Sequence, residues 1–179
     1  MPGASYTVDA PVLWFAREAA LAAGLNILAV VDGGQTAADP TAFVQERADA
    51  ALEAVADPSP LLIGKSVSTL AAGIAAERAL VSVWLTPLLN AGQSRVARRV
   101  VAAMQRSMAP ALLVGGSADS AWSPTVARSI PLAEVLEIDG ADHALQVPGD
   151  PLASIAALRA LVERLMAFIQ TAHPEPRAR

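Results

Sequence analysis

A candidate nucleophile lies where an apolar run gives way to a small-residue helical pattern. The run at 61–63 stops at Gly64, and the helical pattern begins directly after Lys65 and Ser66. This order predicts a buried strand, a sharp turn and a helix, with the Ser66 hydroxyl exposed at the end of a sheet. The first amides of that helix would lie beside the hydroxyl, where they can bind negative charge. The alternative is a serine that only starts the helix, because serine is a good N-cap.

Two further reactive side chains, Asp119 and His143, follow later apolar runs. Asp119 comes after the run at 111–114, and His143 comes after the run at 135–138. A hydroxyl becomes a strong nucleophile when a base removes its proton, and an imidazole base needs a carboxylate to fix its tautomer. Asp119 could instead simply form a turn. Asp142 is the direct neighbour of His143 and is therefore poorly placed to face its ring.

The elements that must position these residues alternate along the chain. Amphipathic segments separate short apolar runs, and Trp84 within one run is expected in the core. The runs predict strands at 26–31, 61–63, 80–85, 111–114 and 135–138. Strands separated by helices form a doubly wound α/β fold, here a mostly parallel sheet of about five strands with helices on both faces. Because residues that follow parallel strands meet at one edge, Ser66, Asp119 and His143 are expected there together.

Helix ends are marked by acidic residues, prolines and glycine. We expect acidic caps at Asp9, Asp39 and Asp150, each at or near a proline, and Gly24 at the end of the first helix. Of the 179 residues, 54% are apolar and 17% charged, which suits one domain with a sizeable core. We expect that domain over residues 1–170, and a disordered tail over the polar residues 171–179.

Several classes of function are disfavoured by composition. The net charge of -4 argues against nucleic-acid binding, and the absence of cysteine removes thiolate chemistry. The two histidines are far apart and no carboxylate cluster has ligand spacing, so we expect no metal and no cofactor. The start lacks a signal-peptide pattern, and the longest uncharged stretch, at 79–94, is interrupted by proline and glycine. We therefore expect a cytoplasmic protein with no membrane span, and the sequence leaves its oligomeric state open.

A competing motif is the phosphate-binding loop, because Gly64-Lys65-Ser66 ends as that motif does. The motif needs a glycine five residues before Gly64, and this chain has Ser59 there. A strand of bulky residues cannot wrap its amides around phosphates, so nucleotide binding is disfavoured. We expect Lys65 to be solvated, with attraction of an anionic substrate as the alternative.

The chain resembles the α/β-hydrolase fold family over nearly its whole length. The turn at Ser66 is similar to Gly-x-Ser-x-Gly, with Ser68 in place of the second glycine, and the order serine, aspartate, histidine also matches. The resemblance implies a small lidless serine hydrolase, similar to small bacterial hydrolases of unassigned substrate. It implies that Ser66 is the nucleophile, Asp119 the orienting acid and His143 the general base.

The resemblance also implies an oxyanion hole made by the amides of Val67 and Ala4. In the family a strand leads into the loop that carries the second amide, whereas this sequence begins at the loop. We therefore expect a minimal fold with truncated N-terminal strands. Tyr6 and Trp122 are candidates to line the substrate pocket, although aromatic residues near strand ends also serve in packing.

The function implied by the resemblance is cleavage of an ester or thioester bond in a small acyl substrate through an acyl-enzyme. The alternative is a non-catalytic interaction or structural protein that keeps the hydrolase fold, because an incomplete sheet can pair with another chain. The presence of Ser66, Asp119 and His143 together favours the enzyme.

Overall fold

The computed structural model of the chain describes residues 1–31, 39–90, 92 and 94–173. Its sheet contains four parallel strands in the spatial order β1-β2-β3-β4. They are β1 (Leu62–Lys65), β2 (Ser82–Leu85), β3 (Ala111–Gly116) and β4 (Ala133–Ile138). The predicted α/β class with a parallel sheet is confirmed.

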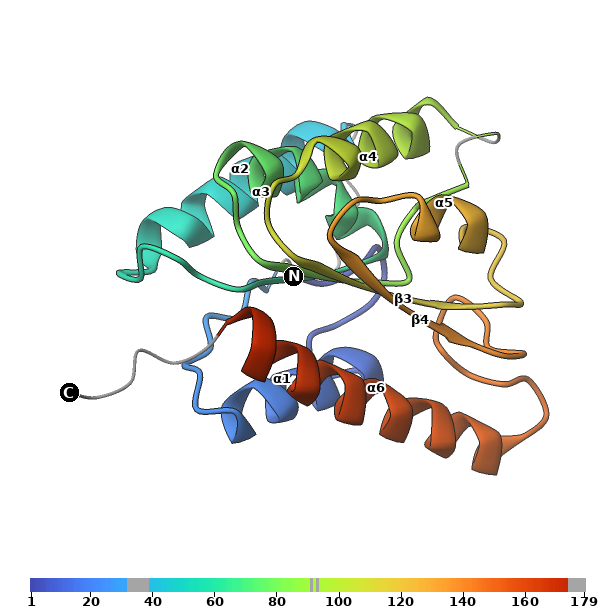
Figure 1. Ribbon diagram of the computed structural model, residues 1–179. Helices are drawn as coiled ribbons and strands as arrows, with labels where there is room; N and C mark the ends of the chain where they lie inside the picture. Colours follow the sequence, from blue (N-terminus) through green and yellow to red (C-terminus); the bar gives the residue numbers. More distant parts are fainter. Residues whose placement is uncertain (32–38, 91, 93, 174–179) are drawn as a thin grey trace.

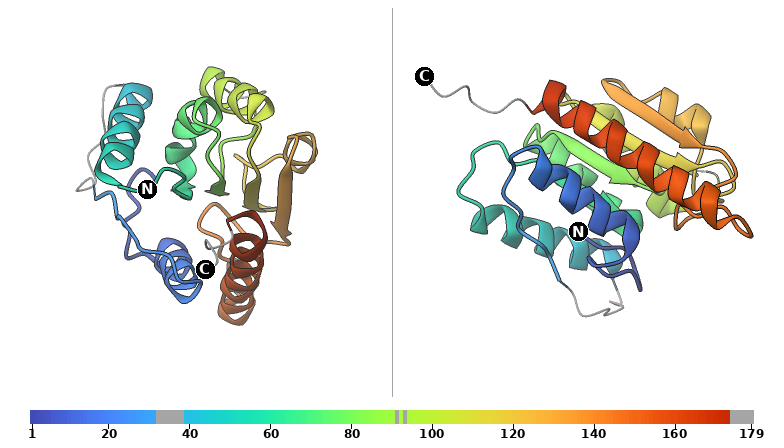
Figure 2. Two further views of the ribbon diagram at one scale, coloured as in Figure 1. Left: turned by 60° about the vertical axis from the view of Figure 1, so that its left-hand side comes forward. Right: turned by 90° about the horizontal axis from the view of Figure 1, so that it is seen from below.

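Helices cover both faces of this sheet (Figure 1). On one face α1 (Pro11–Ala22) and α6 (Pro151–Ala172) lie side by side, as Figure 2 also shows. The other face carries α2 (Pro40–Ala54), α3 (Ala72–Glu77), α4 (Arg95–Arg106) and α5 (Pro124–Arg128). No helix in the described part of the chain is long and apolar enough to cross a membrane.

Two apolar cores result, one on each face. Strand β2 contributes to both, because successive side chains of a strand point to opposite faces. Val83 and Leu85 belong to the core under α1 and α6, whereas Trp84 belongs to the core under α3 and α4. Trp84 is only 1% exposed, so its predicted core position is confirmed.

Three of the four predicted helix ends are confirmed. The Asp39 carboxylate accepts the Thr41 and Ala42 amides at the start of α2, and the Asp150 carboxylate accepts the Ala153 amide at the start of α6. Gly24, with a φ of +88°, follows α1 in the left-handed conformation typical of helix ends. The prediction for Asp9 is wrong: Ala10 is the N-cap of α1 and makes no side-chain cap, while Asp9 pairs with Arg17 at 3.3 Å.

The segment predicted as the first strand, at 26–31, is not a strand in the structure. No described strand pairs with it, and an extended segment without a neighbour has no partner for its backbone groups. Leu28 is 51% exposed and Val31 is 67% exposed, as expected for a segment outside the sheet.

The C-terminal helix is longer than predicted. Helix α6 continues through Ala172, so the first two residues of the expected tail are helical. Residues 174–179, which the sequence assigns to that tail, lie outside the described residues.

Candidate active site

Ser66 stands directly after β1, at the start of the 3-10 helix η1 (Ser66–Ala71) that leads into α3. Its φ is +54°, a left-handed conformation that is uncommon for a residue with a side chain and that concentrates at functional sites. Gly64 makes this turn possible, because a Cβ there would lie 2.8 Å from the Trp84 ring and 3.2 Å from the Ser68 Cβ. The predicted strand, turn and helix are present, with a 3-10 helix as the first helical segment.

The structure brings the three predicted reactive side chains together. His143 Nε2 lies 2.7 Å from Ser66 Oγ, and His143 Nδ1 lies 2.8 Å from Asp119 Oδ2. The other carboxylate oxygen of Asp119 accepts the amide of Ala121 at 2.9 Å. The Asp119 side chain is 2% exposed, whereas that of His143 is 42% exposed. A buried carboxylate, an imidazole open to solvent on one side and a hydroxyl thus form one continuous hydrogen-bonded chain.

The loops after β3 and β4 touch each other, which places Asp119 beside His143. Gly116, the last residue of β3, lies so close to Ala141 that a Cβ on Gly116 would lie 2.0 Å from the Ala141 carbonyl oxygen. Asp142 shapes the histidine loop, since its carboxylate accepts the amides of Ala144 at 2.8 Å and Gln146 at 3.0 Å. The Asp142 carboxylate therefore serves the loop backbone, and Asp119 is the carboxylate that faces the imidazole.

Lys65 is the only lysine in the sequence, and the prediction that it is solvated is wrong. It is 2% exposed, and its Nζ donates to Thr86 Oγ1 at 3.0 Å and to the His143 carbonyl at 2.9 Å. The ammonium also lies 4.4 Å from the centre of the Tyr6 ring. Burial lowers the pKa of Lys65 to about 8, and the charges of Asp119 and Asp142 act in the opposite direction. Lys65 therefore ties the end of β1 to the loop that carries the imidazole.

The N-terminal loop lies against the serine. A Cβ on Gly3 would lie 3.0 Å from the Ser66 Cβ and 3.6 Å from its Oγ. Ser68, which is 1% exposed, donates its hydroxyl to the Pro2 carbonyl. The residue that replaces the second glycine of the motif therefore anchors this loop.

The main chain of Met1 anchors the same loop to β1. Its amino group donates to the Ile63 carbonyl at 2.7 Å, and the Lys65 amide donates to the Met1 carbonyl at 3.2 Å. Ala4 lies in the turn that follows, which the Tyr6 amide closes on the Gly3 carbonyl at 3.2 Å, and Ala4 is exposed.

Several solved structures resemble this architecture. An alpha-beta serine hydrolase homologue from Coxiella burnetii has 19% identity and a TM-score of 0.66, over 90% of this chain and 77% of that chain. The esterase domain of a Rhodothermus marinus protein has 15% identity and a TM-score of 0.66, over 89% of this chain and 80% of that chain. A monoacylglycerol lipase from Paleococcus ferrophilus has 17% identity and a TM-score of 0.56, over 75% of this chain and 78% of that chain. This chain has an α/β-hydrolase fold. No protein-family model matches the sequence, and no curated protein matches it.

The two aromatic residues predicted near the pocket differ in position on this hydrolase fold. The Tyr6 ring lies beside the Lys65 ammonium at the site. Its hydroxyl accepts the Val12 amide at 3.1 Å, and burial raises the pKa of Tyr6. Trp122 is 5% exposed and packs so closely on Gly115 that a Cβ there would lie 2.2 Å from the indole. Its indole N–H donates to Glu137 at 3.0 Å. Trp122 is thus a core residue.

Thr86 is a residue of the site that sequence reasoning missed. It follows β2, is fully buried and accepts the Lys65 ammonium. Its φ of +46° is a rare conformation for a β-branched residue. The only signal in the sequence was its place directly after an apolar run.

Within the described residues, no three His, Asp or Glu side chains gather in a way that could hold a metal ion.

Proposed function

We propose that this chain is a serine hydrolase that cleaves an ester or thioester bond of a small acyl substrate. The observation that carries the proposal is the hydrogen-bonded chain from Ser66 through His143 to Asp119 on an α/β-hydrolase fold. The likeness of the fold to an esterase domain and a monoacylglycerol lipase supports an acyl substrate.

In the first half of the proposed reaction, His143 Nε2 takes the proton of the Ser66 hydroxyl. Ser66 Oγ then attacks the carbonyl carbon of the substrate, and negative charge develops on the carbonyl oxygen. Asp119 accepts a hydrogen bond from His143 Nδ1–H, which fixes the tautomer and stabilises the imidazolium. The imidazolium returns the proton to the departing alcohol or thiol, and an acyl group remains on Ser66.

In the second half, water enters from the open side of His143 and loses a proton to Nε2 as it attacks the acyl group. Collapse of this second intermediate releases the acid and restores the Ser66 hydroxyl. We assign the oxyanion hole to the amides of Val67 and Ala4. The position of Gly3 beside Ser66 supports a role of the N-terminal loop in that hole.

Labelling with a fluorophosphonate probe, followed by mass mapping of the adduct, tests this proposal. We expect one adduct on Ser66, and we expect none in Ser66→Ala or His143→Ala. Ser129→Ala is the matched control, because it removes a hydroxyl that donates to the Val126 carbonyl at 2.7 Å in the turn after α5, away from Ser66 and the loop of His143. The control should be labelled as fast as the wild type.

The alternative function is a non-catalytic interaction protein with the hydrolase fold, which the place of β1 at the edge of the described sheet favours. Folded protein that takes no label at Ser66, and that hydrolyses no p-nitrophenyl or thioester substrate, would support this alternative and contradict the enzyme.

A further inference from the structure

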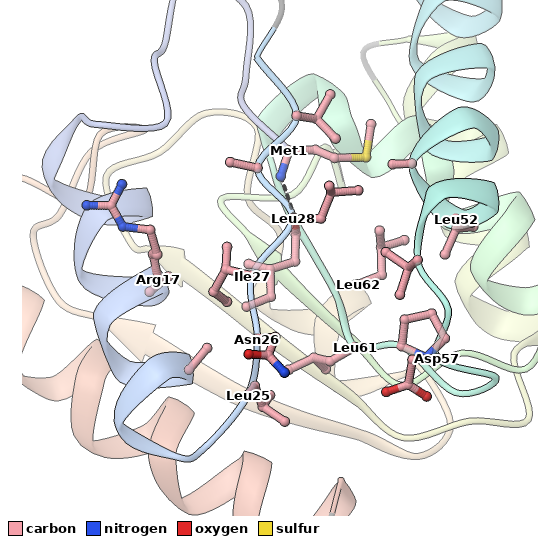
Figure 3. Close-up of a pocket in the computed structure, with 18 of the residues that line it drawn as sticks. Met1, Arg17, Leu25, Asn26, Ile27, Leu28, Leu52, Asp57, Leu61 and Leu62 are labelled. Atoms are coloured by element: carbon pink, nitrogen blue, oxygen red, sulfur yellow. Dashed lines mark hydrogen bonds between the residues drawn. The ribbon is translucent and has the colours of Figure 1, made fainter.

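The strand that carries Ser66 at its end pairs with another strand on one side only, within the described residues. β1 pairs with β2, and beside β1 lies a largely apolar cavity of about 690 Å³ (Figure 3). Leu61, Leu62 and Ile63 line that cavity, together with the coil at 25–30 and the end of α2. Lys65, at the end of the same strand, does not line it. The contacts of the Lys65 side chain therefore help to decide where β1 presents Ser66.

The Lys65 ammonium has partners from three separate parts of the chain. It donates to Thr86 Oγ1 at 3.0 Å, directly after β2, and to the His143 carbonyl at 2.9 Å, in the loop after β4. The Tyr6 ring of the N-terminal loop has its centre 4.4 Å from the same nitrogen. An ammonium has three N–H donors and is attracted to the face of an aromatic ring, so the three partners suit this group.

Stability does not explain why a charge is buried here. Lys65 is 2% exposed, and the removal of a charged group from water is unfavourable unless partners compensate it. An apolar side chain of similar volume often gives a protein as much stability as a buried charge with its partners. A buried ionisable group beside reactive side chains is instead typical of functional sites. We therefore examine what the ammonium does to the geometry of the candidate active site.

Lys65 and Ser66 hold two ends of the same residue. The Lys65 ammonium binds the backbone carbonyl of His143, and Ser66 Oγ lies 2.7 Å from Nε2 of the His143 ring. Because Lys65 and Ser66 are neighbours in the chain, these two contacts close a ring of bonds through His143. Such a ring fixes the histidine loop relative to the serine turn.

Thr86 gives this ring a fixed point inside the sheet. The residue is fully buried, and its amide donates to the Val114 carbonyl of β3 at 2.7 Å. The Thr86 hydroxyl therefore holds the ammonium from the interior of the sheet, on the strand next to β1.

We propose that Lys65 is a positioning residue of the proposed hydrolase, and that its protonated ammonium holds the His143 loop so that the imidazole stays aligned with Ser66. This inference rests on the proposed function, in which His143 is the general base. Loss of the ammonium proton removes the positive charge and one of the three donors. The remaining hydrogen bonds are then weaker, because charge-assisted hydrogen bonds are the stronger kind.

The titratable groups around the ammonium decide the pH at which its hold weakens. Burial lowers the pKa of Lys65 to about 8, against the effect of the Asp119 and Asp142 carboxylates on the loops after β3 and β4. Tyr6 faces the ammonium from the N-terminal loop, and because burial raises the pKa of Tyr6, its hydroxyl titrates at higher pH. His143 presents its backbone carbonyl. Turnover should therefore fall by about fivefold as the pH rises through about 8.

The test is the pH dependence of kcat and KM for hydrolysis of a p-nitrophenyl ester. Misalignment of reacting groups lowers turnover strongly, so Lys65→Met should lower kcat by about 10–10²-fold at neutral pH, with KM unchanged, and should lack the alkaline fall. Thr86→Val removes an acceptor that favours the charged amine, so its alkaline fall should begin at lower pH. Arg159→Met is the matched control, because it removes an exposed cation that pairs with Glu163 on α6, and it should keep the wild-type profile.

Chemical rescue identifies the titrating group. The sequence contains no cysteine, so unfolded Lys65→Cys can be alkylated at one site with 2-bromoethylamine and then refolded. The thiolate displaces bromide and the side chain regains an amine at the position of the lysine amine. The sulfur withdraws electrons, so this amine has a lower pKa than lysine. We expect kcat to recover and the alkaline fall to move to lower pH.

A folded Lys65→Met protein with the kcat and pH profile of the wild type would overturn the proposal. A change of KM alone would also overturn it, because Lys65 would then act on substrate binding. An alkaline fall that is absent from the wild type, or unchanged in Thr86→Val, would contradict it whether or not Lys65→Met folds.

A second readout needs no substrate. The Nδ1–H proton of His143, bonded to Asp119 at 2.8 Å, gives a downfield proton resonance when the imidazole is held in place. Its loss in Lys65→Met or Thr86→Val, but not in Arg159→Met, would support the positioning role even if the protein hydrolysed no ester. An unchanged resonance in both variants would contradict that role. The positioning role and the proposed function can therefore fail separately.

Discussion

The two halves of the candidate site are built with very different support. The half proposed to transfer protons rests on the loops after β1, β3 and β4, and its hydroxyl, imidazole and carboxylate all have partners at 2.7 to 2.9 Å. The half assigned to the oxyanion rests on the loop from Met1 to Tyr6. Three contacts hold that loop to Ile63, Lys65 and Ser68.

This difference shows that side chains at the carboxyl ends of parallel strands can be fully hydrogen-bonded, while β1 pairs with a strand on one side only within the described residues. The proton-transfer half rests on the ends of β1, β3 and β4, where its three side chains are already hydrogen-bonded to one another. The oxyanion half lies on the N-terminal loop, which contacts with Ile63, Lys65 and Ser68 hold in place. Damage to the first half should abolish activity, whereas damage to the second should only reduce it.

The largest effect is expected from Asp119→Asn, which strikes the proton-transfer half. The amide no longer holds the imidazole in the tautomer that accepts the serine proton, and turnover should fall by about 10⁴-fold. The measurement is hydrolysis of a p-nitrophenyl ester together with the rate of fluorophosphonate labelling. Asp139→Asn is the matched control, since Asp139 only accepts the Ser117 hydroxyl. Equal rates for the Asp119 variant and the wild type would assign the acid to another residue.

Gly3→Ala strikes the oxyanion half and should have the next largest effect. The new methyl group would lie 3.0 Å from the Ser66 Cβ and 3.3 Å from the Lys65 carbonyl oxygen, so the loop must move outward. Loss of one oxyanion donor lowers turnover by about 10²–10³-fold. The same ester assay measures this loss.

Gly73→Ala provides the control for that variant, because a Cβ at Gly73 meets nothing within 4 Å. It should keep the wild-type rate. A Gly3 variant with unchanged turnover would remove the N-terminal loop from the oxyanion hole.

Ser68→Ala removes one of the three anchors and should have a smaller effect. The buried carbonyl of Pro2 loses its donor, which lowers the free energy of unfolding by about 1 kcal/mol and turnover by about tenfold. A lower Tm with unchanged turnover would limit Ser68 to a role in stability.

The proton-transfer half could be predicted from sequence, because it depends on a few local signals. Apolar runs mark the strands, parallel topology brings their ends to one edge, and the chemistry of Ser66, Asp119 and His143 then stands out. The caps at Asp39 and Asp150 are equally local. Each of these features is encoded within a few residues of the position concerned.

The features that sequence reasoning missed depend on distant parts of the chain. The segment at 26–31 has the composition of a strand, but strand formation needs a neighbour whose backbone can pair with it. Burial of the Lys65 ammonium depends on Thr86 and on the carbonyl of His143, which are brought near only by the fold. From the sequence, Trp122 could line a pocket or pack in the core. Its indole packs directly on Gly115, which lies in the core, and the sequence around Trp122 does not show this contact.

The smallest effect is expected from the titration of Lys65, which joins the two halves. Because the folded protein lowers the pKa of Lys65 from 10.5 to about 8, the unfolded chain binds more protons above pH 7. The free energy of unfolding should therefore rise with pH through this group. Between pH 7 and 8.5 the rise should be less than about 1 kcal/mol, and Lys65→Met should lack it. Urea unfolding of both proteins at the two pH values measures the difference.

A direct measurement is available because the sequence contains a single lysine. An NMR titration of its side chain should give a midpoint well below the ordinary value for lysine. A midpoint near 10.5, with parallel stability profiles for the wild type and Lys65→Met, would mean that the ammonium is solvated. In that case the ammonium would not hold the His143 carbonyl, and Lys65 would link the two halves through its backbone amide alone.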